Sequence, residues 1–118
     1  MERREHPRFN VVLQVRLAAG THAASMETGN VSESGLFLVT DDVEFLAGVL
    51  PLSSVQLVLL DIERLETIDL SGTVVRIVRG RELRSPGIAV RYDPMPDELR
   101  QRVRQFIRRA RERAETGG

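Results

Sequence analysis

The chain has 118 residues, of which 42% are hydrophobic and 29% are charged, so it is long enough for one hydrophobic core but too short for a separate catalytic domain and regulator. Its 17 basic and 17 acidic residues give a net charge of zero, which argues against a general polyanion binder that depends on a basic field. The absence of cysteine excludes disulfides, thiolate nucleophiles and cysteine metal sites, and it fits a reducing cytosol. We therefore expect a single domain spanning residues 1–118.

Composition also limits the location and the partners of the chain. The N-terminal residues lack the apolar segment of a signal peptide, and no apolar run approaches the roughly 20 residues needed to cross a bilayer. Tryptophan is absent and aromatic residues make up 4%, which leaves little ring area for stacking a nucleic-acid strand. The sequence therefore predicts a soluble, cytoplasmic protein with no membrane partner and no nucleic-acid partner.

The chain begins with a polar arm that leads into a strand. Residues 1–8 contain two acids, three arginines, a histidine and a proline, with no apolar residue after Met1, so nothing in them can anchor to a core. Such a segment is predicted to be mobile without a ligand. From Phe9 to Leu17 apolar residues recur at every second position, the pattern of a half-buried first strand.

A weak, polar segment and four alternating or apolar runs predict five more strands. Gly29 and Gly72 lie inside two of these segments and favour a bulge or a bend. The nearly continuous apolar run at 54–61 predicts a strand buried on both faces. Residues 43–53 are expected to form an irregular crossover with some buried apolar side chains. The five predicted strands cover residues 22–30, 35–40, 54–61, 67–79 and 87–92.

The pattern becomes helical at residues 96–114. Apolar residues at helical spacing predict one buried stripe, formed by Leu99, Val103, Phe106, Ile107 and Ala110. Seven arginines share this segment, and we interpret them as a solvated face, with contact to an acidic protein or to nucleic-acid phosphates as the alternatives. The whole pattern predicts a mostly-β fold, a six-stranded antiparallel β-barrel over residues 9–92 with a C-terminal amphipathic α-helix. An open sandwich is the alternative that the pattern alone allows.

The sequence lacks the patterns of catalytic and metal sites. His6 and His22 are the only imidazoles, and they have no metal-ligand spacing. No G-x-S-x-G nucleophile motif and no phosphate-binding loop is present. Asp41 and Asp42 are adjacent strand-end residues that point to opposite sides and more often cap a turn than form a catalytic pair. We therefore expect no enzyme activity, no catalytic residue, no metal and no cofactor.

Two short polar stretches carry the functional signal. Arg4 and Arg8 lie four residues apart in the arm, and their guanidinium groups suit a phosphate or the O6 and N7 atoms of guanine. Asn30 and Ser32 carry short side chains able to bond to base edges, and Gly35 permits a positive φ or a close backbone approach. Either stretch alone is a common pattern. Placed before the first and third strands, they together predict one anion- and guanine-reading site.

This combination resembles the PilZ family of bacterial cyclic di-GMP receptors, whose pattern is an R-x-x-x-R arm followed by [D/N]-x-S-x-x-G. Arg3 matches the preceding arginine that many members carry, and residues 87–90 loosely match a strand near the end of such domains. The resemblance implies a six-stranded barrel that binds cyclic di-GMP, often as an intercalated pair, with the arm wrapping over the ligand. Asparagine at position 30 is within the pattern, although it replaces an anionic acceptor by an amide.

The resemblance also implies the roles of the site residues. Arg4 and Arg8 would grip guanine edges and phosphates, with Arg3 assisting at a phosphate. Asn30 and Ser32 would bond a guanine on the barrel face. The last site residue, Gly35, would be structural.

The leading functional hypothesis is a non-enzymatic receptor in second-messenger signalling. Cyclic di-GMP would order residues 1–8 and so create or mask a docking surface for an unidentified downstream protein. The alternative is a nucleotide-independent protein-interaction adaptor that has a PilZ-like barrel and uses its arginine-rich helix as the interface. A small-barrel nucleic-acid binder is the third hypothesis.

Overall fold

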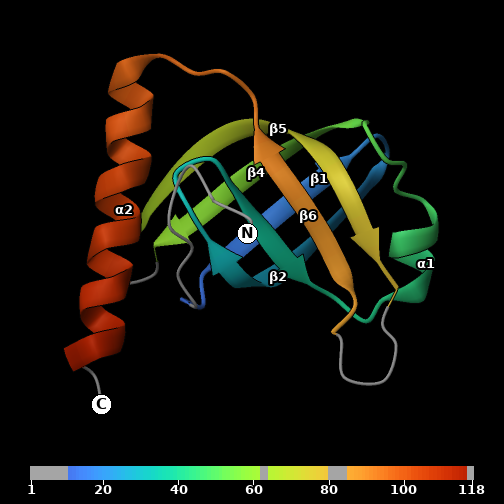
Figure 1. Ribbon diagram of the computed structural model, residues 1–118, viewed down its shortest axis with the longest axis horizontal. Coiled ribbons are helices and arrows are strands. Elements are labelled where there is room, and N and C mark those ends of the chain that lie inside the picture. The colour runs from blue at the N-terminus through green and yellow to red at the C-terminus, as the bar shows by residue number, and fades with distance from the viewer. Residues whose placement is uncertain (1–10, 62–63, 80–84, 117–118) are drawn as a thin grey trace, which may run out of the picture.

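The structure is a computed structural model that describes residues 11–61, 64–79 and 85–116. Within these ranges the chain forms six strands and two helices (Figure 1). In chain order they are β1 (Gln14–Ala19), β2 (His22–Val31), β3 (Gly35–Val39), α1 (Val43–Ala47), β4 (Ser54–Asp61), β5 (Glu66–Val78), β6 (Gly87–Tyr92) and α2 (Asp97–Thr116).

The six strands form a closed barrel in the order β1-β2-β3-β6-β5-β4, and every neighbouring pair is antiparallel. Closure pairs the polar backbone groups of every strand and leaves no open sheet edge. The predicted six-stranded antiparallel barrel is therefore confirmed, and the open sandwich is wrong.

One side of each strand fills the barrel interior. Val15 and Leu17 of β1 are fully buried, and the residues between and beside them are not. β4 follows the same alternation, because Leu57 and Leu59 are buried whereas Val58 and Leu60 are only half-buried. The prediction that β4 is buried on both faces is thus wrong: β4 is part of the barrel wall, and its other face lies on the outside.

The first strand begins later than predicted, at Gln14. Val11 and Leu13 are buried but lie outside the regular ladder. The Thr28 hydroxyl donates to the carbonyl of Val11 at 2.6 Å and accepts from the N–H of Leu13 at 2.8 Å. The Thr28 side chain thus replaces part of the backbone hydrogen-bond ladder before β1. The β2–β3 register then shifts between Thr28 and Asn30, which confirms the predicted irregularity at Gly29.

The crossover expected to be irregular contains the short helix α1. The carboxylate of Asp42 accepts the N–H of Phe45 at 3.0 Å, a side-chain N-cap that starts the helix. Phe45 and Leu46 are buried. Sequence reasoning missed this helix because five residues are too few to show a helical period.

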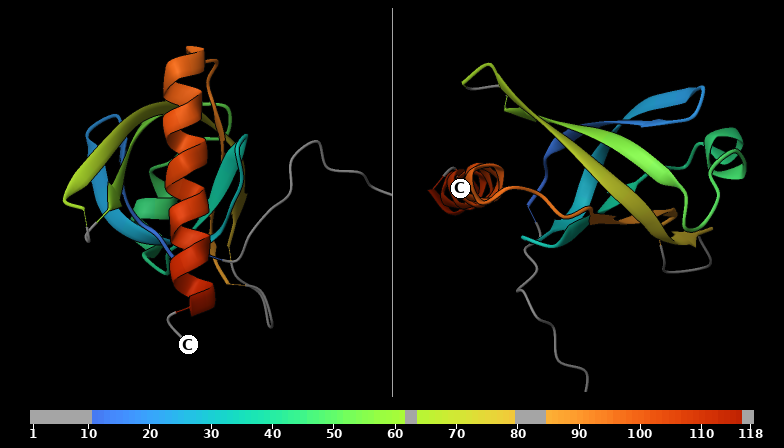
Figure 2. Two further views of the ribbon diagram at one scale, coloured as in Figure 1. Left: turned by 90° about the vertical axis from the view of Figure 1, so that its left-hand side faces the viewer. Right: turned by 90° about the horizontal axis from the view of Figure 1, so that it is seen from above.

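The C-terminal helix is confirmed, from Asp97 to Thr116 rather than 96–114. Val103, Phe106 and Ile107 are buried, whereas Leu99 at the start of the stripe is half-buried. Figures 1 and 2 show α1 and α2 on opposite sides of the barrel. Within the described ranges, neither helix has the length and apolarity needed to cross a membrane.

Candidate ligand-binding site

The turn between β2 and β3 is built around the side chain of Ser32, which is fully buried. Its hydroxyl oxygen accepts the backbone N–H groups of Ser34 at 3.1 Å and Gly35 at 3.2 Å. The same oxygen lies 3.2 Å from the carbonyl of Gly35 and 3.1 Å from the hydroxyl of Ser34. The backbone N–H of Ser32 donates to the Gly35 carbonyl at 2.8 Å. Ser32 therefore fixes the shape of the turn from inside.

Gly35, the first residue of β3, allows the turn to approach β6. It pairs with Arg91, and a Cβ atom at position 35 would overlap the carbonyl oxygen of Val90. Backbone atoms in a sheet cannot give way as the end of a flexible side chain can. Any residue larger than glycine would therefore push β3 away from β6.

Asn30 lies on the outer face of the barrel, where the strand pairing defines a row of side chains. Asn30 is opposite Phe37, Phe37 is opposite Ala89, and Ala89 is opposite Arg76. Directly opposed residues of antiparallel strands share one face of the sheet, so the row crosses β2, β3, β6 and β5. Asn30, Phe37 and Ala89 are half-buried, and Arg76 is exposed.

The ring of Phe37 lies over two glycines of the neighbouring strands. A Cβ atom at Gly29 would come 3.3 Å from the ring, and one at Gly87 would come 2.6 Å from it. Side chains at these two positions would displace the ring. The outer face thus presents an amide, an apolar ring and a guanidinium in one row, groups that suit a planar, polar and anionic ligand.

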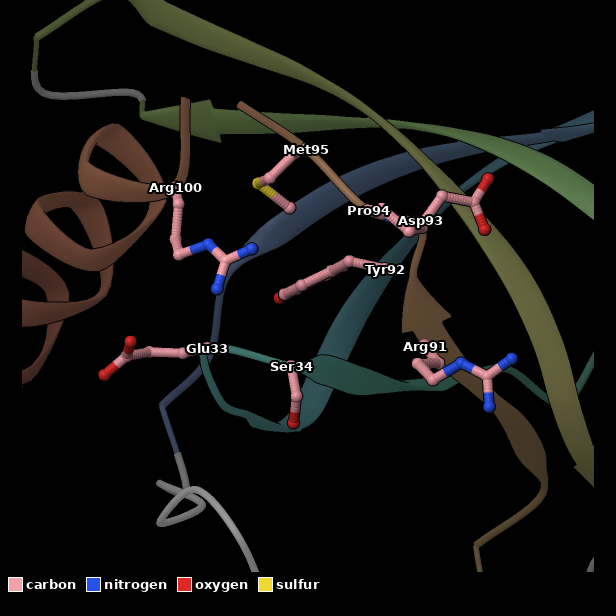
Figure 3. A pocket seen from close by; sticks show the side chains of 8 residues that line it. All are labelled: Glu33, Ser34, Arg91, Tyr92, Asp93, Pro94, Met95 and Arg100. Atoms are coloured by element: carbon pink, nitrogen blue, oxygen red, sulfur yellow. The ribbon is translucent and has the colours of Figure 1, made fainter. Parts of the chain in front are cut away.

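A hollow of about 390 Å³ adjoins the turn (Figure 3). Arg100 of α2 extends over it towards Tyr92, whereas the Arg91 guanidinium points away on the other side. Acidic and basic groups both line the hollow, so its electrostatic potential is not of one sign. Its lining comes from the β2–β3 turn, the end of β6, the following connection and α2: Glu33, Ser34, Arg91, Tyr92, Asp93, Pro94, Met95 and Arg100.

An ion pair connects the turn to α2. The Nε atom of Arg104 lies 2.7 Å from Oε1 of Glu33, in a charge-assisted hydrogen bond. Glu33 lies between Ser32 and Gly35 in the sequence motif and was not predicted as part of the site. No sequence signal identifies the pair, because 71 residues separate its members.

Three of the six predicted site residues thus come together, namely Asn30, Ser32 and Gly35 at the end of β2 and the start of β3. The other three, Arg3, Arg4 and Arg8, lie outside the described residues. In the part of the chain that the structure describes, no group of three or more histidine or acidic residues could hold a metal ion.

The chain thus combines three features. They are a small closed β-barrel, a serine-centred turn of the form N-x-S-x-x-G and a helix joined to that turn. A sequence model of the PilZ domain matches residues 2–109. The chain belongs to the PilZ domain family, which confirms the family that the two motifs indicate. A search of curated protein sequences finds no significant match.

Solved structures of PilZ proteins share the fold. The PilZ domain of YcgR from Escherichia coli, determined with cyclic di-GMP, has a TM-score of 0.74 and 13% identity, with coverage of 98% of this chain and 99% of that one. The MrkH–cyclic di-GMP complex from K. pneumonia has a TM-score of 0.79 and 16% identity over 100% of this chain and 57% of the other.

The inhibitor of motility MotI/DgrA of Bacillus subtilis has a TM-score of 0.74 and 21% identity over 92% of this chain and 51% of the other. This chain thus spans about half the length of MotI/DgrA and MrkH. At these identities the similarity shows a shared fold.

Proposed function

We propose that the chain is a bacterial, cytoplasmic receptor for cyclic di-GMP with no enzymatic activity of its own. The observation that carries the proposal is the motif turn: Ser32 and Gly35 fix its backbone, and the β2–β3 pairing just before it sets Asn30 on the outer face of the barrel. The family match includes the arginine arm at Arg4 and Arg8. YcgR and MrkH, which share the fold, were both determined with cyclic di-GMP.

Each site residue has a proposed role, which rests on the family resemblance for the three arginines and also on the surrounding structure for Asn30 and Ser32. Arg4 and Arg8 bind the guanine edges and the phosphates as bidentate donors, and Arg3 assists at a phosphate. Asn30 bonds a guanine edge through its amide. Ser32 supports this contact by holding the turn. A direct bond from the buried Ser32 hydroxyl to guanine, which the family pattern implies, would have to replace one of the turn's own hydrogen bonds.

Ligand binding is proposed to order residues 1–8 and to pass the signal to another protein. The ligand carries two phosphates and two guanines, so three arginines together with the outer-face amide can engage both kinds of group. An arm ordered over the barrel would change the surface that a partner meets. The partner is a downstream protein recognised through that surface.

Calorimetric titration with cyclic di-GMP tests the site. Arg4→Ala and Arg8→Ala should each weaken binding by about 1–3 kcal/mol, the usual value of a bidentate base contact. Arg16→Ala on β1, an exposed arginine outside the motifs, is the control and should bind as the wild type does. Unchanged affinity in both arm variants would reject the site, and a wild-type protein that does not bind would reject the function.

A nucleotide-independent adaptor is the second candidate, supported by the charge of α2. This helix carries seven arginines and four acids, a net charge of +3, so the rest of the neutral chain carries −3. A basic helix suits an acidic protein partner. A panel of cyclic di-GMP, GMP, GTP and oligonucleotides separates the candidates: saturable binding of cyclic di-GMP alone supports the receptor, and capture of a partner without any nucleotide binding supports the adaptor.

A further inference from the structure

We propose that Arg104 is a positioning residue for the ligand site: it holds and neutralises the Glu33 carboxylate, so that this acid does not oppose an anionic ligand at the neighbouring turn. The inference rests on the proposed function, because it concerns affinity for cyclic di-GMP. It adds a residue of α2, outside both sequence motifs, to the determinants of binding.

The position of Glu33 gives such a residue a role. Glu33 lies in the turn with Ser32, three residues after Asn30 of β2, and it is the only acidic residue from Asn30 to Gly35. With the ligand bound at Asn30, as proposed, an unpaired carboxylate at position 33 would repel its phosphate diesters, because screening at physiological salt extends over roughly 8 Å. Figure 3 shows its side chain extending away from Arg91 and from strands β3 and β6.

The two elements that carry the pair, α2 and the β2–β3 turn, hold Arg104 and Glu33 in position to contact each other. The helical neighbours of Arg104, Val103 and Phe106, are buried in the core, which fixes the face of α2 on which Arg104 lies. On the other side, the Ser34 carbonyl accepts the N–H of Tyr92 at 2.9 Å and so holds the turn against β6.

The ion pair therefore joins two rigid elements. Forming the pair therefore orders only the two side chains, of which that of Arg104 is 46% exposed and that of Glu33 is 30% exposed.

The charge balance follows from this geometry. The Nε–Oε1 distance of 2.7 Å joins opposite charges directly, so the pair has no net charge as seen from the ligand. Without Arg104, the partly exposed Glu33 side chain would be charged and able to turn towards the ligand. Coupling between two interactions is reciprocal. If the Glu33–Arg104 pair changes the affinity for the ligand, then ligand binding changes the strength of this pair and so connects the site to α2.

The test is a titration of cyclic di-GMP against Arg104→Ala, Glu33→Gln and the double variant. Arg108→Ala, an exposed arginine one turn along α2, is the matched control because it removes the same charge. Arg104→Ala should bind about two- to fivefold more weakly, the range expected for a partly exposed pair, and the loss should shrink at high salt. The double variant should bind as Glu33→Gln does, and Arg108→Ala should bind as the wild type does.

Two titration results would overturn the proposal. Wild-type affinity in Arg104→Ala would show that the pair does not matter to the ligand, and a double variant as weak as Arg104→Ala would show that Arg104 acts on the structure alone. A wild type that does not bind cyclic di-GMP would reject the proposed function instead. Amide chemical shifts of residues 32–35 then test the positioning: they should move in Arg104→Ala and stay in place in Arg108→Ala, and unmoved shifts in both would refute it.

Discussion

Gly35 at the start of β3 faces the carbonyl oxygen of Val90 on β6 so closely that a Cβ atom would overlap it. Gly35→Ala should therefore lower the free energy of unfolding by about 1–3 kcal/mol, the usual effect of overpacking a rigid site. Urea unfolding measures this. Gly48→Ala is the control: its Cβ would meet the exposed His22 ring, which can move, so its stability should stay close to that of the wild type. Equal stability of the two variants would contradict the close approach.

The Ser32 hydroxyl gives a second test of the turn. Ser32→Ala removes the acceptor of two backbone N–H groups, those of Ser34 and Gly35, inside a buried turn. Leaving such groups without a partner should lower the free energy of unfolding by about 1–3 kcal/mol. Hydrogen exchange should also become faster at these two amides. Ser25→Ala, at an exposed position of β2, should change neither quantity, and slow exchange in Ser32→Ala would show that other acceptors hold the turn.

Local patterns predicted the elements that such patterns can specify. Alternation marked the barrel strands, and the helical spacing of Val103, Phe106 and Ile107 marked the buried face of α2. Each of these signals lies within one element. The glycine bulge at Gly29 was also local, because its cause is the backbone freedom of one residue.

The features that were missed depend on contacts between distant residues. The Thr28 side chain replaces ladder bonds to Val11 and Leu13 across 15 to 17 residues, and no local pattern encodes that. The row that places Phe37 beside Asn30 requires the register of β2 against β3, including its shift. Sequence motifs thus predicted Asn30, Ser32 and Gly35 as site residues. Tertiary pairing added Phe37 and the pair of Glu33 and Arg104 beside them.

Leu52 offers a prediction about backbone strain. Its φ is 65°, in the left-handed region that residues with a Cβ atom disfavour by about 1–2 kcal/mol, and the residue is 77% exposed. Leu52→Gly should relieve this strain and lose little burial. The greater conformational entropy of glycine in the unfolded state offsets part of this gain, so we expect stability to rise by up to about 1 kcal/mol. Thermal unfolding checks the sign. Leu50→Gly, at an exposed leucine that is not at positive φ, should instead lower stability, and a loss in both variants would contradict the strain.

Asp61 at the end of β4 fixes the C-terminal half of α2. Its side chain is fully buried, its carboxylate lies 3.8 Å from Arg109 and 3.7 Å from Arg113, and it accepts the N–H of Arg64 at 3.2 Å. Asp61→Asn keeps the shape and removes the charge on which both guanidinium groups converge. Because these groups are a quarter to a third exposed, water offsets part of the loss, and we expect stability to fall by about 1–3 kcal/mol.

Urea unfolding measures the total effect of Asp61→Asn, and hydrogen exchange along α2 localises it. Exchange should accelerate in the last turns of the helix, near Arg109 and Arg113, more than near Val103, because the buried apolar stripe still holds the first half. Asp69→Asn on β5 removes the same charge from an exposed position and should leave both measurements unchanged. Equal acceleration in α2 and in the barrel strands would show instead that Asp61 stabilises the barrel rather than the docking of α2.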